Sequence, residues 1–315
     1  MRIAIVGTGG VAQRHLGVLR QLPDLGLVGH LSAGSGRAEA QASRWGGRGY
    51  TDLAVMLDRE RPEAVWLCVT PERHGPAEAA LAEQGIPFFV EKPLAADLAT
   101  AERVAALVAR RSLIVGVGYK FRALDTLPKA RALLNERRAR MLLLVWHDAL
   151  PPPAWWRDPA RGGGQIVEQA THLVDLARHL VGEGEVISAQ AQPLSDERVP
   201  EVSVALLRFD GVPGLLSATC LLAGRQAIHL QLVCQGRVLT ITERSLLIET
   251  GESADEHPVT VDPFLVEDAA FLRAVREHEP AHLLSSYADA LKSHALCCAI
   301  RDAYTDTVTA PGWRG

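Results

Sequence analysis

The stretch "AIVGTGGVAQRH" (residues 4–15) joins an apolar run to closely spaced small residues. Gly7, Gly9 and Ala12 have GxGxxA spacing, in which the first glycine allows a tight turn, the second lets the backbone approach a pyrophosphate and the alanine lets a helix pack closely on a strand. The helix N-terminus would offer N–H groups to phosphates. We therefore expect a strand, a turn and a helix that bind a dinucleotide through Gly7, Thr8, Gly9, Gly10, Val11 and Ala12. A glycine turn with only a structural role is the alternative.

The surrounding pattern extends this expectation to a whole domain. From Arg2 to about Tyr119, apolar runs alternate with helix-like segments, as in "RIAIVG", "LGLVGHLS", "AVWLCVT", "PFFVEKP" and "LIVGVGY". Near-continuous apolar strands that alternate with helices are typical of a parallel, doubly wound sheet. We predict an α/β protein whose residues 1–119 form a dinucleotide-binding Rossmann domain.

After about residue 120 the pattern changes. A helix-like "TLPKARALLNERRA" precedes the strand-like "MLLLVWHD", and four or more strand-like runs follow Gly182 without intervening helices. This indicates an α+β domain with a largely antiparallel open sheet over residues 120–315, with helices again from Pro263 to Tyr304. The apolar alternation of its strands suggests that one sheet face pairs with another subunit, which predicts a homodimer or homotetramer. We also expect this second domain to bind the substrate.

Composition narrows the class of protein. The 315 residues are 48% hydrophobic and 22% charged with a net charge of -4, which is ordinary for a globular chain and gives no electrostatic signal for nucleic acid. No apolar run approaches the roughly 18 residues of a membrane span, and Met1 leads directly into a strand, so we expect a cytoplasmic protein without a membrane partner. Five cysteines in apolar contexts fit reduced core thiols, with no metal site expected.

The position that contacts the cofactor ribose is occupied by Ser32. An acidic residue at the end of the second strand would hold the 2'-hydroxyl of NAD, and its carboxylate would repel the 2'-phosphate of NADP. Ser32 lacks that charge, and Ser35 and Arg37 follow it. The cofactor is therefore NAD(P), with NADP slightly favoured. That these are ordinary loop residues beside bound NAD is the alternative.

The segment "GGGQIVEQATHLVDLARHLVG" (residues 162–182) carries acid–base chemistry. On a helix that begins near Gln165 and ends at Gly182, Glu168 and His172 are i,i+4 neighbours. Asp175 lies three residues beyond the histidine. A histidine beside a carboxylate is suited to accept a proton from an alcohol. The alternative for His172 is a hydrogen bond between helix and sheet.

Taken together, "GTGGVA", "TPERH", "EKPLA", "GVGYKFR" and "GGGQIVEQATHLVD" resemble the Gfo/Idh/MocA family of NAD(P)-dependent oxidoreductases, in order and along nearly the whole chain. The resemblance implies that Lys92 lies beside the nicotinamide and polarises the reacting oxygen, and that Pro93 follows a cis bond. It also implies that His172 is the general acid/base. Glu168 stands where the family usually has Asp. Further cofactor contacts are expected from Thr70, Pro71, His74, Glu91 and Lys92.

These residues predict an enzyme that transfers a hydride between a CH–OH group of a sugar, cyclitol or related polyol and NAD(P), in a cleft between the domains. His172 would remove the hydroxyl proton, Lys92 would stabilise the oxygen, and Glu168 would orient the histidine or bind a neighbouring hydroxyl. The rest of the substrate wall is expected from Tyr119, Lys120, Arg122, Trp155, Trp156 and Arg157. Glycoside hydrolysis by transient oxidation with NAD and a non-catalytic dinucleotide sensor are the alternatives.

Overall fold

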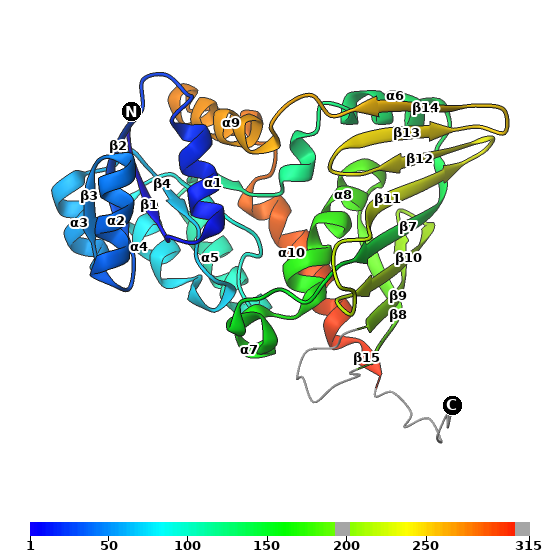
Figure 1. The fold of residues 1–315 in the computed structure, drawn as a ribbon, viewed down its shortest axis with the longest axis horizontal. Coiled ribbons are helices and arrows are strands. Elements are labelled where there is room, and N and C mark those ends of the chain that lie inside the picture. The colour runs from blue at the N-terminus through cyan, green and yellow to red at the C-terminus, as the bar shows by residue number, and fades with distance from the viewer. Residues whose placement is uncertain (193–201, 306–315) are drawn as a thin grey trace. The chain divides into compact units, whose positions relative to one another are not determined.

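The computed structural model describes residues 1–192 and 202–305, and these form two compact units (Figure 1). The first unit contains residues 1–123 and 261–291, and the second contains 124–260 and 292–315. This differs from the predicted division at residue 120, because a late segment of the chain returns to the first unit. Helix α9 (Pro263–Glu277) belongs there since its Phe271, Leu272 and Val275 are part of the same buried cluster as Trp66.

The first unit contains a six-stranded sheet in the order β3-β2-β1-β4-β5-β6, with every pair parallel. Its strands are β1 (Arg2–Val6), β2 (Gly26–Leu31), β3 (Arg48–Tyr50), β4 (Ala64–Leu67), β5 (Phe88–Val90) and β6 (Val115–Val117). The strand order reverses between β1 and β4, which is the switch point where such sheets bind ligands. The predicted doubly wound α/β sheet is confirmed, although the three-residue β3 was not foreseen.

Side chains that alternate along β1 separate the two cores of this sheet. Ala4 and Val6 belong to one buried cluster, whereas Ile3 and Ile5 belong to the other. Helices α3 (Leu53–Glu60), α4 (Pro76–Gln84) and α5 (Leu98–Arg110) contribute to the first cluster, and α1 (Gly10–Leu19) and α9 to the second. Helix α2 (Ser35–Trp45) packs beside β2 and β3. Both faces of the sheet are covered, which is why its central strands β1, β4 and β5 consist almost wholly of buried apolar residues.

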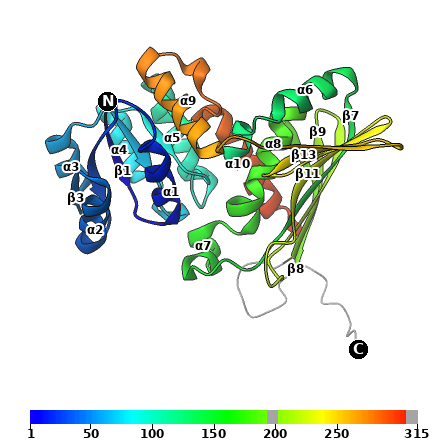
Figure 2. The same cartoon turned by 45° about the horizontal axis from the view of Figure 1, so that its top comes forward.

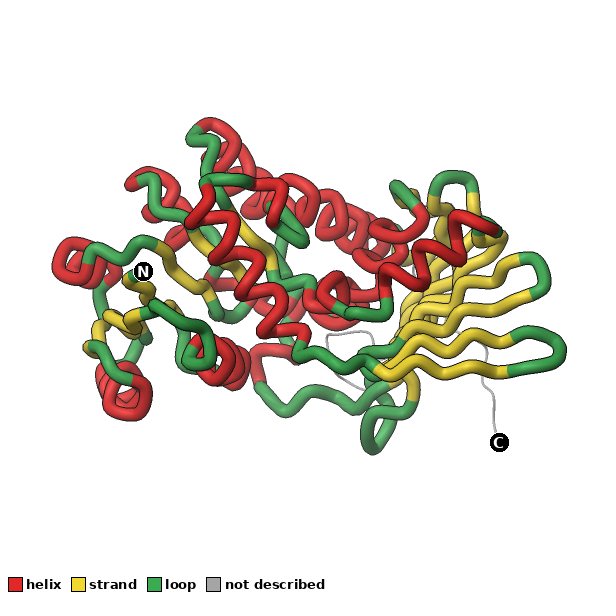
Figure 3. Tube along the Cα trace, turned by 90° about the horizontal axis from the view of Figure 1, so that it is seen from above, coloured by secondary structure: helices red, strands yellow, loops and turns green. Residues whose placement is uncertain are grey.

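The second unit contains a nine-stranded sheet in the order β14-β13-β12-β11-β7-β10-β9-β8-β15. Its strands are part of the yellow tube in Figure 3. The strands are β7 (Ala139–His147), β8 (Gly184–Gln192), β9 (Val202–Phe209), β10 (Val212–Thr219), β11 (Ala227–Cys234), β12 (Arg237–Ile241), β13 (Ser245–Glu249), β14 (Ala254–Pro258) and β15 (Tyr304–Thr305). Only β7 with β10 and β8 with β15 pair in parallel within the described ranges. The prediction of a largely antiparallel open sheet is confirmed.

Helices cover one face of this sheet. The helices of the second unit are α6 (Leu127–Glu136), α7 (Pro159–Gly162), α8 (Thr171–Val181) and the part of α10 (Tyr287–Asp302) from Lys292 onward. Helix α8 packs against β7, β9 and β11 (Figure 2). Residues of β9 alternate accordingly, with Ala205 and Leu207 buried and Val204 and Leu206 exposed. The sheet therefore has one covered face and one that presents apolar side chains.

The five cysteines are free and buried, which agrees with their prediction as core thiols. Among the described helices, none combines the length and the apolar character that a membrane span requires.

Candidate active site

The glycine turn has the geometry that its spacing predicts. Gly7 has φ of 112°, and a Cβ there would lie 2.0 Å from the carbonyl oxygen of Cys68, so only glycine fits. Gly9 precedes α1 in an extended conformation and faces open space where its Cβ would be, while Ala12 is buried between helix and sheet. Thr8, Gly10 and Val11 complete the turn, and Val11 is exposed beside the first N–H groups of α1. The turn can accept a pyrophosphate.

A buried polar pair holds this turn in place. Gln41 on α2 donates from Nε2 to the carbonyl oxygen of Gly7 at 3.2 Å and to Nδ1 of His30 at 3.1 Å. His30 in turn donates from Nε2 to the carbonyl oxygen of Gly46 at 2.7 Å. Burial lowers the pKa of His30, so its neutral tautomer, with Nδ1 as acceptor, fits these contacts. The sequence analysis did not identify Gln41 as a support for the turn.

Ser32 follows β2 directly, as the sequence predicts, and is buried; its contact with the cofactor ribose stays a prediction. Its Oγ lies 3.5 Å from Oγ1 of Thr8 and 3.5 Å from the backbone nitrogen of Gly34. Ser35 and Arg37 are exposed in the first turn of α2. The residue after β2 therefore carries a hydroxyl and no carboxylate.

The turn after β4 brings Thr70, Pro71 and His74 to the same edge of the sheet, because β1 and β4 are parallel neighbours. Pro71 is buried, and Thr70 is half-buried. His74 is turned inward, since its Nδ1 lies 2.6 Å from Oε1 of Glu78. Oε2 of Glu78 accepts from the backbone N–H of Gly75 at 2.7 Å. His74 therefore has a structural partner, and its contact with a cofactor stays a prediction.

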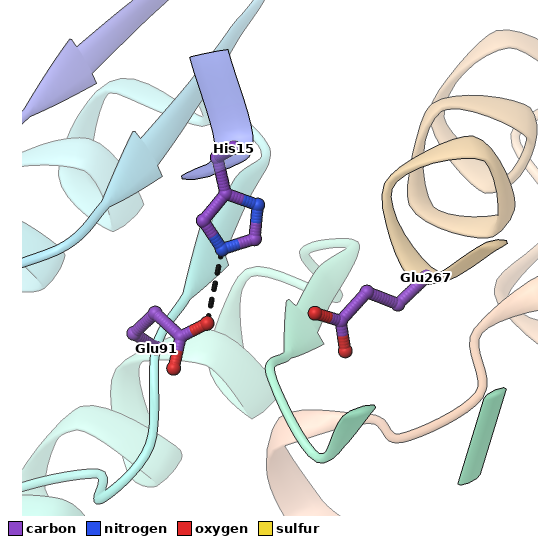
Figure 4. A group of neighbouring side chains, drawn as sticks. All are labelled: His15, Glu91 and Glu267. Carbon is purple, nitrogen blue, oxygen red and sulfur yellow. Dashed lines mark hydrogen bonds and ion pairs between the residues drawn. The ribbon is translucent and has the colours of Figure 1, made fainter. Parts of the chain in front are cut away.

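The "EKP" segment follows β5 at the same edge, and the Lys92–Pro93 peptide bond is cis, as the resemblance implied. Lys92 is half-buried, whereas Glu91 is only 6% exposed. Oε1 of Glu91 lies 2.9 Å from Nε2 of His15 on α1 (Figure 4). The carboxylate predicted to contact a cofactor is thus occupied by an interaction inside the first unit.

His15 is the centre of a buried charge network that the sequence analysis missed. Its Nδ1 lies 2.9 and 3.0 Å from the two carboxylate oxygens of Asp268 on α9, and Oδ1 of Asp268 also accepts from Nε1 of Trp66 at 2.9 Å. Burial would lower the pKa of His15, but Asp268 and Glu91 outweigh it and raise that pKa well above its ordinary value. A polar residue three positions after the small Ala12 and directly before the apolar Leu16, on the buried side of α1, is the signal that could have revealed it.

Glu267 lies next to this network and is 3% exposed. Neither of its carboxylate oxygens has a hydrogen-bond partner within the described residues, although the side chain points toward His15 and Glu91 (Figure 4). Burial and the nearby Glu91 carboxylate raise the pKa of Glu267 well above its usual range. The neutral acid is the form that this environment favours.

Tyr119 and Arg122, predicted as substrate contacts, lie just after β6. Tyr119 is buried within the core of the first unit. Arg122 is also buried, and its Nη1 lies 2.5 Å from Oδ2 of Asp289 and 3.1 Å from the carbonyl oxygen of Leu284. Lys120 places its ammonium 5.4 Å from the ring centre of Phe264. These side chains have partners inside the first unit, and their contacts with a substrate stay predictions.

In the second unit, the segment that precedes α8 departs from a regular α-helix. Residues 166–170 form a π-helical turn, and α8 begins only at Thr171. Such turns occur often at functional sites because they re-aim side chains. Glu168 lies in this turn and accepts from Nε1 of Trp156 at 3.0 Å. Trp156 is 1% exposed, and its indole packs with Cys220; its contact with a substrate stays a prediction.

His172 is the second residue of α8 and is buried. Its ring stacks on Trp146 with centres 6.1 Å apart and planes 14° apart. Asp175 has a different role from the one its spacing suggested, because it accepts from Oγ of Ser293 at 2.6 Å. Ser293 also accepts from Nη1 of Arg178 at 2.6 Å, so Asp175 ties α8 to α10. Glu168 and His172 stay the predicted catalytic residues of this segment.

A doubly wound unit with a GxGxxA turn and a lysine after β5, joined to an antiparallel-sheet unit with a histidine on its covering helix, defines an NAD(P)-dependent oxidoreductase of two units. The chain belongs to the GFO/IDH/MocA oxidoreductase family: residues 1–119 match the NAD-binding Rossmann-fold model, and residues 137–239 match a C-terminal domain model of the same family. It binds NAD(P).

Individual relatives are distant. The chain is 24% identical over 303 residues to myo-inositol 2-dehydrogenase from Thermotoga maritima, covering 89% of this chain and 90% of the relative. It is 25% identical over 298 residues to 4-carboxy-2-hydroxymuconate-6-semialdehyde dehydrogenase from Sphingobium, covering 88% and 91%. A 3-ketoreductase from Actinomadura kijaniata, solved with NADP and TDP-benzene, superposes with a TM-score of 0.86 at 21% identity, covering 96% and 98%. The last comparison supports the fold.

Proposed function

We propose that the protein transfers a hydride between a CH–OH group of a sugar, cyclitol or related polyol and NAD(P). The observation that carries this proposal is the edge of the parallel sheet where Gly7, Thr70 and Lys92 follow β1, β4 and β5, three neighbouring strands. A dinucleotide turn and a lysine that can act on a substrate oxygen thus meet at the switch point of the sheet. The name of the myo-inositol 2-dehydrogenase relative supports a polyol substrate.

Each proposed catalytic residue has one task. When bound, the nicotinamide accepts or supplies the hydride. The ammonium of Lys92 donates a hydrogen bond to the substrate oxygen and stabilises its developing negative charge. A ring nitrogen of His172 takes the hydroxyl proton in oxidation and returns it in reduction. The proposal requires Lys92 and His172 to act on the same substrate carbon.

Glu168 and Trp156 together support the proton transfer. The hydrogen bond from Trp156 occupies Oε2 of Glu168 and fixes the direction of its carboxylate. Because the π-helical turn carries Glu168 immediately before the helix of His172, the carboxylate can orient the imidazole or bind a substrate hydroxyl. The extra methylene relative to aspartate lengthens the reach of this acid.

The preferred cofactor is proposed to be NADP. Ser32 contributes no charge at the ribose position, and the guanidinium of Arg37 is exposed two residues into α2. A 2'-phosphate would gain an ion pair with Arg37 and would meet no carboxylate from Ser32.

We also propose a homo-oligomer that works in the cytoplasm. The exposed face of the second sheet carries large apolar side chains on adjacent strands, namely Met141, Ile187, Val204, Leu206 and Leu215. A second copy of the chain would remove this apolar surface from water. Five free, buried thiols are compatible with a reducing compartment.

The first test is a titration of the purified protein with NADH and NADPH by nicotinamide fluorescence, with analysis of any cofactor that co-purifies. A screen of sugars and polyols with the tighter cofactor follows, and the proposal expects stoichiometric release of reduced cofactor from NAD(P)+. Product formation without release of reduced cofactor would favour hydrolysis through transient oxidation instead. Cofactor binding without any turnover, unchanged in Lys92→Ala, would favour a dinucleotide sensor.

A further inference from the structure

His15 is held on every side within the first unit. Both carboxylate oxygens of Asp268 accept from Nδ1 of His15, and Oε1 of Glu91 accepts from its Nε2. The faces of the imidazole meet the edges of Phe89 and Phe264, each with ring centres 5.2 Å apart. The side chain is fully buried. A rotation of the ring would therefore break two charged hydrogen bonds and disturb two aromatic contacts.

The carboxylate of Glu91 is confined on its other side by β6 and the residues after it. A Cβ on Gly118 would lie 2.7 Å from Oε1 of Glu91, so the absence of a side chain at Gly118 leaves room for this carboxylate. The backbone N–H of Glu91 donates to the carbonyl oxygen of Leu67 on β4 at 2.9 Å. Both the backbone and the side chain of Glu91 thus have fixed partners.

We propose that His15 is a positioning residue for Lys92 and acts through Glu91. Glu91 directly precedes Lys92 in the chain, and Pro93 and Leu94, which follow the lysine, are buried. A displacement of the Glu91 carboxylate therefore moves the backbone that carries the lysine, whose ammonium has to reach a substrate oxygen. The catalytic meaning of this positioning rests on the proposed function, whereas the positioning itself does not.

The same side chains raise the question of a metal ion, because ligand atoms of His15, Glu91 and Glu267 lie within 4.8 Å of one another. The 2.9 Å between Nε2 and Oε1 is the distance of an N–H···O hydrogen bond. Two ligands on a tetrahedral zinc at about 2.0 to 2.1 Å would be separated by about 3.3 Å. The geometry favours a proton between His15 and Glu91.

The test combines two substitutions that disturb Glu91 from opposite sides. His15→Gln removes the charge and one of the two donors, and Gly118→Ala pushes on the carboxylate from β6. Val104→Ala is the matched control, because Val104 is buried on α5 and belongs to the other core cluster. Each variant is compared with the wild type in its cofactor dissociation constant and in kcat on the best substrate of the screen.

A second readout does not depend on catalysis. The chain has only four lysines, at 92, 120, 129 and 292, so reductive methylation with a 13C label gives few NMR signals. Lys92→Arg assigns the Lys92 signal. In His15→Gln and Gly118→Ala, the chemical shift of the Lys92 signal is expected to move toward that of an unrestrained lysine. The chemical shifts of Lys129 and Lys292 should stay unchanged.

We expect kcat to fall on the order of 100-fold in both variants, as an ångström-scale misplacement of a catalytic group can cause, with the cofactor dissociation constant within about twofold of wild type. An unmoved Lys92 signal, or a loss of kcat no larger than that of Val104→Ala, would overturn the positioning role. One equivalent of a divalent metal in the purified protein, lost in His15→Gln, would overturn it as well. If the wild type turns over no substrate, the proposed function fails while the NMR comparison still decides the inference.

Discussion

Nε2 of His15 lies 2.9 Å from Oε1 of Glu91, and this hydrogen bond joins the helix after the dinucleotide turn to the residue before Lys92. The cofactor end and the lysine end of the first unit thus share one buried support. Both ring nitrogens of His15 face carboxylates, so only the doubly protonated imidazole can donate to both. Protonation of His15 is therefore part of how the first unit is built.

The stability of the protein is predicted to fall with rising pH through this histidine. The pKa of His15 is raised in the folded state above the value of 6.5 that applies when it is exposed. Its contribution is complete below pH 6.5 and is lost as the pH rises through the folded pKa. Burial also raises the pKa of Glu267 well above its usual range, and this acid acts in the same direction.

Urea denaturation of wild type and His15→Gln between pH 6 and 9 measures this effect. At pH 6 the variant is expected to lose about 3 to 5 kcal/mol of unfolding free energy, since it leaves Asp268 and Glu91 buried without their cation. The difference should shrink as the pH rises. Comparison with the variant cancels other histidines such as His30, whose pKa shift has the opposite sign. A difference that is constant with pH would contradict the assignment.

The ribose position predicts a switch of cofactor. Ser32→Asp places a carboxylate beside the 2'-phosphate of NADP. It is expected to lower the binding affinity for NADPH at least tenfold, about 1.4 kcal/mol, with little change in the affinity for NADH. Arg37→Ala should lower the binding affinity for NADPH and leave that for NADH unchanged. Arg44→Ala on the same helix is the control, because Arg44 packs over Trp45 in the last turn of α2. Equal losses for both cofactors in either test variant would contradict a 2'-phosphate contact.

Local sequence signals predicted the parallel sheet because the central strands β1, β4, β5 and β6 are short, apolar runs that alternate with helices. The turn between β1 and α1 and the place of Ser32 directly after β2 depend on neighbours in sequence, and the structure has both. The return of α9 to the first unit depends on Phe271 and Val275 packing beside Trp66, some two hundred residues earlier. No periodicity within α9 shows to which unit its apolar face belongs.

The site was harder to predict where side chains bind each other. Glu91 had the spacing of a cofactor contact, but its partner His15 lies on another element, and their pairing depends on the tertiary fold. Asp175 lies three residues after His172, yet its carboxylate accepts a hydrogen bond from Ser293 on α10. Trp156 has the sequence context of a loop tryptophan and is nevertheless buried against Glu168. Sequence spacing places such residues on an element, whereas distant contacts decide their roles.

Substitutions at the proposed catalytic residues are expected to affect turnover far more than cofactor binding. Lys92→Ala should lower kcat about 10²- to 10³-fold, because an ammonium that stabilises the reacting oxygen is lost. His172→Asn should lower kcat about 10²- to 10⁴-fold by removing the acid/base. Val104→Ala again serves as the control for a buried substitution, and steady-state kinetics with a cofactor titration separates the two effects. A kcat within threefold of wild type in either variant would remove that residue from the mechanism.

Glu168 gives a finer test of the proton transfer. Glu168→Gln keeps an acceptor oxygen for Nε1 of Trp156 but removes the charge, so the indole contact is retained while the electrostatic effect on the site is lost. We expect kcat to fall about tenfold or more and its pH profile to shift toward lower pH, because a neutral neighbour stabilises the charged imidazole less. Trp156→Phe should lower kcat with an unshifted profile, since the carboxylate keeps its charge. An identical pH profile for Glu168→Gln and wild type would show that this charge does not act on the titrating base.

The exposed face of the second sheet predicts how the chain associates. Leu206 on β9 and Leu215 on β10 are direct cross-strand neighbours, and they are 43% and 47% exposed. Two such leucines on adjacent strands form an apolar surface that a second copy of the chain can cover. Leu206→Arg would place a charge in the interface and is expected to weaken association at least 100-fold, about 2.8 kcal/mol. Sedimentation velocity at micromolar concentration measures the change, with Val55→Arg on α3 as a control for an exposed apolar residue away from this sheet. A wild type that sediments as a monomer, or a Leu206→Arg variant with unchanged association, would rule out this face as the interface.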